Sequence, residues 1–455
     1  MGSEGPAVVT DLKLSQVGET EIIVPAEPTP NGRVFLSNID LCLVIPVETV
    51  YFYPANPNKS GDNLVKTLKE ALGKVLVPYH FMTGRLKPEG PGSRRLEIDL
   101  NRAGAQFNEY RSEVRISDLG DVVQPNPLFR KLVPTKFLNV SSVLDTPLLA
   151  VQVTIFACGG YTMGFMMSHS VFDGPGAIDF FLNYTSIARG EGVLFTPTYD
   201  RTSLKARVPP IIKYEHPENF ELPADVPGLE AGVSPFSLPD EMDKEFEELE
   251  NIHTHVTKTF PFTPEAIDTL KKRALEGGVI KRVSTFEVVA AHVWLARTKA
   301  VELPEVPFNL LFAVDIRNRV IPPLPKHFAG NAVYSACARG CPSEIKQYTF
   351  VEAVQVIQRA IEQVTDDYVR SSFDWGETRR GIPALFGGFF LSAWWKMPFY
   401  SIDYGWGKPI YAGPIVTPMV EFVLMLSNGK QDGGLNLVMA LEPEQMELFQ
   451  EYIKV

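Results

Sequence analysis

Two apolar strands followed at once by a glycine-rich turn and a helix place the strongest constraint on the fold. Residues 147–170 read PLLAVQVTIFACGGYTMGFMMSHS, which indicates two strands joined at Gly159-Gly160. Gly174-Pro175-Gly176 then turns the chain sharply into a helical pattern that ends at Gly190. This succession predicts that the residues between strand and helix are held at a strand end.

His169 lies at that strand end. Strand alternation places it on the more apolar face, together with Tyr161, Met163, Phe165 and Met167. One interpretation is a core histidine whose hydrogen bonds are satisfied. The other is a general base in a dry site, because partial burial disfavours the imidazolium and leaves a lone pair available near neutral pH.

Asp173 follows His169 by four residues. The chain has seven histidines, so this spacing alone is weak evidence for a catalytic pair. An aspartate beside a helix N-terminus can accept backbone N–H bonds. We therefore expect Asp173 to brace the loop that presents His169, without needing to touch the imidazole.

The composition is that of an ordinary globular protein with a large core. The 455 residues are 45% hydrophobic and 21% charged, and the net charge of -11 argues against nucleic acid as a partner. Four cysteines are too few for a disulfide framework, so we expect a reducing, cytoplasmic environment. Cys337 and Cys341 lack a second ligand pair, which favours two buried thiols over a metal site.

The sequence predicts no membrane span. The most apolar long stretch, at 384–400, is interrupted by Lys396 before it reaches the length that a bilayer requires. The N-terminus lacks the basic and apolar regions of a signal peptide.

Helical and strand patterns alternate through both halves of the chain. Residues 61–76, 263–275 and 284–300 have helical spacing, whereas 308–318 and 435–443 resemble buried strands. A proline-rich passage at 201–250 separates the halves and ends in an acidic run at 240–250, which is typical of a solvated helix face. We therefore expect a mixed α/β protein with domains at 1–200 and 251–455 and a crossover at 201–250.

A second motif, DYGWGKP at 403–409, gives the histidine a context. HxxxDG in mid-chain with this motif near the end resembles the BAHD acyltransferases of plants, which use acyl-coenzyme A to acylate alcohols or amines. Further matching segments occur in order: VPAEPTPNGRVFLSNID at 24–40, LVPYHFMTGRL at 76–86, STFE at 284–287, VDIRNR at 314–319 and AGNAV at 329–333. The chain departs from the family at Tyr404, where phenylalanine is usual, and at 79–83 before GRL.

The resemblance implies a chloramphenicol-acetyltransferase-like fold of two domains, with mixed sheets, helices and an active-site channel between the domains. His169 would act as general base on the acceptor, with no covalent acyl-enzyme. Trp406 would donate its indole N–H to the oxyanion, or else only pack the turn. The residues expected to hold the site are Asp173, Asp403, Gly405, Gly407 and Arg317.

Arg317 is the expected partner of Asp173, although Asp315 or solvent are alternative partners. Acyl-CoA would be a co-substrate, and no permanently bound cofactor or metal is implied. Lys258, Ser284 and Thr285 are the candidate CoA contacts. Ser284 is equally suited to cap a helix with Glu287, and the two roles are compatible.

The resemblance extends to a branch of hydroxycinnamoyl transferases that act on ω-hydroxy fatty acids and fatty alcohols, carried by 201–210, 294–300 and 310–333. It suggests a feruloyl-type donor and a role in plant specialised metabolism. Members that use shikimate commonly have an arginine where this chain has Lys396, and lysine cannot form a bidentate fork to a carboxylate. Trp394 and Lys396 are therefore candidates for an acceptor pocket that suits an alkyl or aromatic alcohol.

Several alternatives stay open. Benzoyl transferases and amide-forming members of the family are similar, and a catalytically silent BAHD-like binding protein is a further candidate. The sequence contains no GxSxG of a serine hydrolase and no GxGxxG of a dinucleotide-binding fold. We expect a monomer that binds acyl-CoA and a small alcohol or amine.

Overall fold

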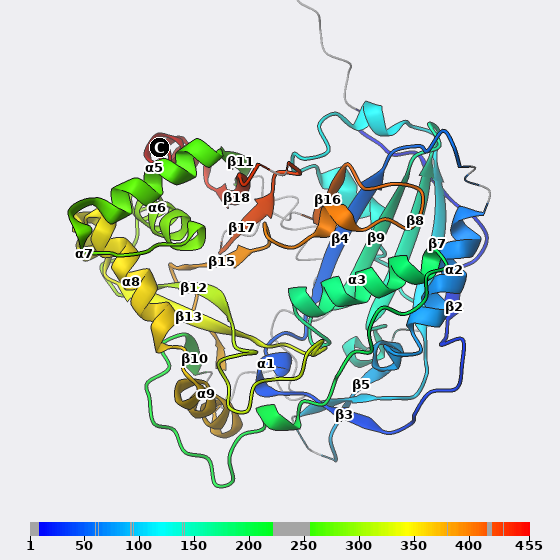
Figure 1. Cartoon of the computed structure of the whole chain (residues 1–455), viewed down its shortest axis with the longest axis horizontal. Helices are drawn as coiled ribbons and strands as arrows, with labels where there is room; N and C mark the ends of the chain where they lie inside the picture. The colour runs from blue at the N-terminus through cyan, green and yellow to red at the C-terminus, as the bar shows by residue number, and fades with distance from the viewer. Residues whose placement is uncertain are drawn as a thin grey trace, which may run out of the picture.

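A computed structural model describes the chain from residue 9 to 455. The described residues exclude 60, 62, 92, 94, 139, 141, 222–254, 380, 416–420 and 431. They form two large mixed sheets with helices, arranged side by side (Figure 1). The expected mixed α/β architecture is confirmed.

Seven strands of the described residues make the first sheet. In order across it they are β1 (Leu14–Gln16), β7 (Ala105–Ser112), β8 (Leu149–Phe156), β9 (Tyr161–Ser168), β4 (Pro46–Tyr53) and β16 (Tyr411–Pro414), while β2 (Glu21–Ile23) also pairs with β7. β8 and β9 form the antiparallel hairpin that the sequence predicts. Gly159, with φ of +80°, lies in the turn between them, a conformation that favours glycine.

Six described strands make the second sheet. In order they are β11 (Val256–Phe262), β18 (Leu435–Leu441), β17 (Phe422–Ser427), β15 (Phe389–Ala393), β12 (Phe308–Asp315) and β13 (Val333–Gly340). Two small sheets pair β3 (Arg33–Phe35) with β6 (Leu96–Asp99) and β5 (Arg85–Pro88), and β10 (Asn219–Glu221) with β14 (Gly381–Pro383).

Helices cover both sheets. They are α1 (Asn38–Leu41), α2 (Leu64–Val75), α3 (Gly174–Ala188), α5 (Pro264–Leu275), α6 (Thr285–Ala300), α7 (Pro342–Gln347), α8 (Phe350–Gln363), α9 (Asp366–Thr378) and α10 (Pro443–Tyr452). Short 3-10 helices occur at His80–Thr83, Ile116–Leu119, Pro127–Leu132, Val143–Asp145, Thr202–Leu204, Glu276–Gly278 and Phe399–Ser401. α2 and α3 lie with the first sheet, whereas α5, α6 and α8 lie with the second (Figure 1).

The apolar face of β9 is part of the first core. Tyr161, Met163, Phe165 and Met167 are all buried in one cluster with residues of α2 and α3, as alternation predicts. The opposite face of β9 is also covered, because the Leu132 carbonyl lies 1.9 Å from the position that a Cβ on Gly164 would occupy. The hairpin that leads to His169 is therefore packed on both faces.

The C-terminal half of the chain reaches into the first sheet. β16 pairs with β4, and Phe399, Ile402, Tyr404 and Trp406 belong to the core of the first sheet. The domain boundaries expected from the sequence, 1–200, 201–250 and 251–455, stay a prediction. The first sheet is not confined to the N-terminal range, because β16 of the C-terminal half belongs to it.

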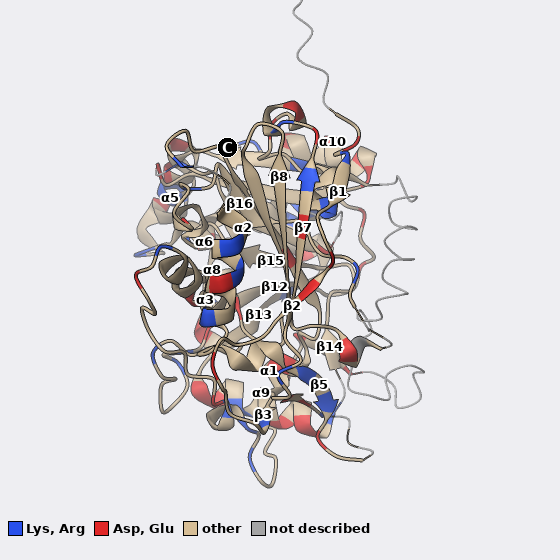
Figure 2. Cartoon of the chain, turned by 90° about the vertical axis from the view of Figure 1, so that its right-hand side faces the viewer, with Lys and Arg blue, Asp and Glu red and all other residues tan. Residues whose placement is uncertain are grey.

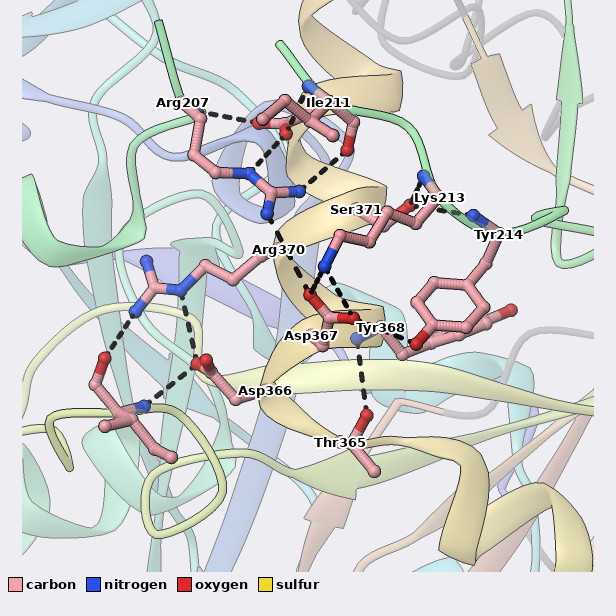
Figure 3. A network of polar contacts seen from close by, with 12 residues as sticks. Arg207, Ile211, Lys213, Tyr214, Thr365, Asp366, Asp367, Tyr368, Arg370 and Ser371 are labelled. Carbon is pink, nitrogen blue, oxygen red and sulfur yellow. Dashed lines mark hydrogen bonds and ion pairs between the residues drawn. The ribbon is translucent and has the colours of Figure 1, made fainter.

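The described part of the crossover is fixed to α9 (Figure 3). Lys213 and Tyr214 both contact Asp367, at 2.7 and 2.9 Å, and Arg207 Nε lies 2.6 Å from the buried carboxylate of Asp374. Further along, β10 pairs with β14, so the crossover has fixed contacts up to Glu221. The acidic run at 240–250 lies outside the described residues.

The two cysteines of the CxxxC pair are half-buried and free, not buried as expected. Cys337 lies in β13, an edge strand of the second sheet, which explains its incomplete cover. Burial and the charge of Glu218 raise the pKa of the Cys337 thiol to about 12. Among the helices that the structure describes, none is long and apolar enough to cross a bilayer.

Candidate active site

His169 directly follows the end of β9, at the start of a tight loop into α3. Its backbone N–H donates to the Ile45 carbonyl at 2.8 Å, and the residue is half-buried. Its Nδ1 is buried and has no hydrogen-bond partner among the described residues. The ring is therefore not a core histidine with both nitrogens satisfied.

Asp173 is the N-cap of α3. Its Oδ1 accepts the Gly176 N–H at 3.2 Å, and Pro175 in the first turn has no N–H to satisfy. The same carboxylate accepts two hydrogen bonds from Arg317, at 2.7 and 2.9 Å, and one from the Ala332 N–H at 2.9 Å. Asp173 thus braces the loop through contacts with Gly176, Arg317 and Ala332, and none of its described hydrogen bonds goes to the imidazole.

The Arg317 fork crosses between the two halves of the molecule. Burial by itself lowers the pKa of Arg317, but its contacts with Asp173 and Asp315 raise that pKa above its ordinary value. The Asp315 contact is the longer one, at 3.5 Å. Both partners considered from the sequence are present, and Asp173 is the closer.

Three further buried residues contact this loop or one another, and no motif in the sequence assigned them a role. Asn331 donates to the His169 carbonyl at 2.7 Å, and Arg201 donates to the Val171 carbonyl at 2.5 Å. Asp40 contacts both of these side chains. Asp40 and Asn331 occur in the LSNID and AGNAV segments, so their positions were visible in the sequence although their function was not.

The DYGWG turn is organised by Asp403. Its Oδ1 accepts the Gly405 and Gly407 N–H groups at 2.7 and 2.9 Å. Gly405 and Gly407 have φ of +99° and +110°, so both positions favour glycine. Lys59 closes the turn from outside, since its Nζ donates to the Gly405 carbonyl at 2.8 Å.

Trp406 is buried in the core of the first sheet. Lys59 Nζ lies 4.4 Å from the centre of its ring, and Asn56 donates to its backbone carbonyl at 3.2 Å. These contacts favour the packing role. Donation to an oxyanion by the Trp406 indole stays a prediction.

The candidate CoA residues lie on the second sheet and its helices. Lys258, in β11, donates to Gln450 at 2.7 Å. Ser284 caps α6 and forms the capping box with Glu287, and Thr285 is the first residue of that helix. The capping role of Ser284 is therefore present in the structure, while CoA contact by these three residues stays a prediction.

The candidate acceptor residues follow β15. Trp394 donates its indole N–H to Ser392 at 2.9 Å, and Lys396 is exposed, with Nζ 5.5 Å from the centre of the Trp395 ring. Met397 packs on Gly174, because a Cβ at Gly174 would lie 2.3 Å from the Met397 Cε. This segment therefore touches the start of α3 beside Asp173.

A second histidine has the geometry of a catalytic triad. His216 Nε2 lies 3.0 Å from Ser371 Oγ, and its Nδ1 lies 2.8 Å from Glu218 Oε1. However, all three residues are buried, and Ser371 Oγ accepts the N–H groups of Lys213 and Tyr214 at 2.8 and 3.2 Å. This serine is a structural acceptor, so the cluster does not support the hydrolase hypothesis.

The model of the Transferase family matches residues 15–454. The chain belongs to this family, the BAHD acyltransferases. It is thus an acyl-CoA-dependent acyltransferase, as the motifs at His169 and Asp403 predict.

Similar proteins cover nearly the whole of this BAHD acyltransferase. An omega-hydroxypalmitate O-feruloyl transferase of Arabidopsis thaliana is 34% identical over 95% of the chain and 91% of the relative. An anthranilate N-benzoyltransferase of Dianthus caryophyllus is 32% identical over 96% of the chain and 98% of the relative. The crystal structure of vinorine synthase superposes with a TM-score of 0.72 at 22% identity and covers 96% of both chains, which shows the fold.

Proposed function

We propose that this BAHD acyltransferase moves a hydroxycinnamoyl group, such as feruloyl, from its CoA thioester to the hydroxyl of a small acceptor. The observation that carries the proposal is the presentation of His169. A half-buried imidazole stands at the end of a packed strand, and its loop is fixed by the fork between Asp173 and Arg317. The similarity to an omega-hydroxypalmitate O-feruloyl transferase of Arabidopsis supports the choice of donor and of a hydroxyl acceptor.

The proposed reaction needs a single base. Nδ1 of His169 is covered by protein, which leaves Nε2 as the nitrogen for proton transfer. Nε2 takes the proton from the acceptor hydroxyl as its oxygen attacks the thioester carbonyl carbon. The tetrahedral oxyanion collapses, the carbon–sulfur bond breaks, and the imidazolium returns the proton to the CoA thiolate. General-base catalysis of this kind supplies about 10²–10⁴-fold, and positioning supplies much of the rest.

The acceptor is proposed to be an alkyl or aromatic alcohol. Met397 brings apolar surface to the start of α3, and Trp394 packs against the core of the first sheet. Lys396, which lies between them in the sequence, is exposed. Lysine, unlike arginine, cannot bind a carboxylate through two parallel hydrogen bonds. Lys396 therefore disfavours shikimate, which carries a carboxylate, as the acceptor. The Lys, Arg, Asp and Glu residues of the described chain are intermixed on the side shown in Figure 2, in keeping with the absence of nucleic acid from the proposed partners.

An amide-forming activity is the second candidate. The Dianthus relative is named as an N-benzoyltransferase and is almost as similar to the chain as the O-feruloyl transferase. The geometry of His169 suits an amine as well as a hydroxyl, since both lose a proton during attack. Donor and acceptor therefore have to be varied together.

The test is acceptor-dependent release of CoA thiol, with product identification by mass spectrometry. Feruloyl-CoA and benzoyl-CoA are each offered with 16-hydroxypalmitate, fatty alcohols, monolignols, shikimate and anthranilate. Wild type, His169→Ala and the control variant His255→Ala, which changes a residue just before β11, are run together. Feruloyl esters from wild type and His255→Ala alone support the proposal. Benzoyl amides would move the second candidate forward, and no release from folded wild type with any pair would favour a silent binding protein.

A further inference from the structure

The imidazole of His169 needs an orienting partner, because a general base works only when its ring is held in one position. Its Nδ1 has no hydrogen-bond partner among the described residues, so the ring is not oriented in the way that a carboxylate orients the histidine of a triad. The described hydrogen bonds of His169 go through its backbone instead. Its N–H donates to Ile45, and its carbonyl accepts from Asn331.

Asn331 is itself held firmly. Its Nδ2 donates to the His169 carbonyl at 2.7 Å and to Asp40 Oδ1 at 2.8 Å, and its backbone N–H donates to the same Asp40 oxygen at 3.0 Å. Asn331 is completely buried and lies between β12 and β13, on the second half of the chain. Asn331 therefore connects the second half of the chain directly to the backbone of His169.

Asp40 is the centre of this arrangement. Its other oxygen, Oδ2, accepts the Ser37 N–H at 2.8 Å and the Ser37 hydroxyl at 2.7 Å. The same oxygen lies 3.1 Å from Arg201 Nε, and both side chains of this ion pair have no exposed surface. A buried charged pair is stable only where its other polar atoms also have partners. Here Asp40 Oδ1 binds Asn331, and the two terminal nitrogens of Arg201 bind backbone carbonyls.

Arg201 provides a second contact to the loop between His169 and Asp173. One of its terminal nitrogens donates to the Val171 carbonyl at 2.5 Å and the other to the Tyr199 carbonyl at 2.7 Å. The carbonyls of His169 and Val171, two residues apart, are thus both bound by partners of Asp40. The Asp173–Arg317 fork holds the same loop two residues further on.

We propose that Asp40, Arg201 and Asn331 form a positioning unit that sets the orientation of the His169 ring through its backbone. These are positioning residues, since none of them has to touch a substrate. The inference rests on the proposed function of His169 as base. In this proposal Asn331 affects catalysis only through the orientation of the His169 imidazole.

The test is a double-mutant cycle between Asn331 and His169. Asn331→Ala is expected to lower kcat by about 10²-fold, the effect of a misplacement of about 1 Å, with little change in either KM. In the His169→Ala background the same change is expected to leave the residual rate unaltered, because there is no base left to orient. A structural role alone would lower both rates by the same factor through loss of folded protein, and that result would overturn the inference.

Asn309→Ala is the matched control. Asn309 is also buried, also donates from Nδ2 to two acceptors, and also has an Oδ1 without a partner among the described residues. It lies in β12 and is expected to keep its kcat even where its melting temperature falls as far as that of Asn331→Ala. If Asn331→Ala does not fold, Asn331→Ser, which retains one donor, is put through the same cycle.

The two proposals fail differently. If folded wild type releases no CoA thiol with any donor and acceptor, the proposed function is refuted. If wild type is active and Asn331→Ala is equally active, only the proposal of a positioning unit is refuted.

Discussion

Asp173 and Arg317 form a two-bond fork, at 2.7 and 2.9 Å, that ties the start of α3 to the loop after β12. The Asp173 side chain is 1% exposed and that of Arg317 is 15% exposed, so solvent does little to screen the pair. The fork joins the loop of His169 to the half of the chain that carries the second sheet. Its strength can be measured directly.

Removal of one partner should be worse than removal of both. Asp173→Ala leaves the Arg317 guanidinium without its closest partner, and we expect the free energy of unfolding to fall by about 3–5 kcal/mol. Asp173→Ala with Arg317→Met should recover part of that loss, because no uncompensated charge remains. Urea unfolding of both variants checks the prediction, and a double variant less stable than Asp173→Ala would contradict it.

Two tyrosines of one cluster should respond in opposite directions to loss of their hydroxyls. Tyr404 is completely buried, and its hydroxyl has no hydrogen-bond partner among the described residues. Tyr53, equally buried, donates to the Ile402 carbonyl at 3.0 Å. We expect Tyr404→Phe to raise the free energy of unfolding by about 1 kcal/mol and Tyr53→Phe to lower it by about as much. Equal losses in thermal or urea unfolding would show that the Tyr404 hydroxyl is satisfied in solution.

The free energy of unfolding should fall as the pH is lowered, and the lowered pKa of His292 should account for part of this fall. Burial lowers the pKa of His292 below its ordinary value of 6.5, and Arg273 and Lys299 act in the same direction, while its hydrogen bond to the Ile453 carbonyl opposes them. Between the lowered folded pKa and 6.5 the unfolded chain binds more protons, so the free energy of unfolding falls as the pH falls through this window.

His292→Gln keeps a donor for the Ile453 carbonyl but does not titrate. Its stability should therefore change less than that of wild type between pH about 7.5 and about 5.5. His80, whose pKa burial also lowers, retains part of the wild-type dependence. Parallel urea midpoints at the two pH values decide the matter, and identical changes in both proteins would count against a neutral buried His292.

Two glycines near the site should tolerate alanine very differently. A Cβ on Gly164 would lie 1.9 Å from the backbone oxygen of Leu132. This oxygen belongs to the 3-10 helix Pro127–Leu132, so it cannot move without displacing that helix from β9. A Cβ on Gly174 would meet only the end of the Met397 side chain, at 2.3 Å from Cε. Gly164→Ala should thus fail to fold, whereas Gly174→Ala should fold with an altered KM for the acceptor. Adding Met397→Ala to Gly174→Ala should reverse much of that change, and an unaltered KM throughout would separate Met397 from the acceptor.

The sequence predicted the local structure around His169 well because short-range rules determine it. The alternation of β9, the Gly159 turn and the Asp173 cap all follow from residues within a few positions of each other. The contact of Arg317 with Asp173 was expected only through the family resemblance, since 144 residues separate the two.

The parts that escaped prediction depend on long-range contacts. Asp40 and Asn331 are 291 residues apart, and no periodicity connects them. The half-buried state of Cys337 depends on β13 being an edge strand, which strand order decides and composition does not. Likewise, the short strand at 411–414 carries no sequence pattern that assigns it to the first sheet.

The pairing of β16 with β4 has a consequence for synthesis of the chain. β4, which reads PVETVYFY, is translated early, but the strand that covers its edge ends only at Pro414. Until β16 leaves the ribosome, this edge of β4 presents unpaired N–H and C=O groups to any neighbouring chain. A truncated or stalled product that lacks β16 would therefore be prone to edge-to-edge association, which the pairing of β16 with β4 prevents in the complete chain.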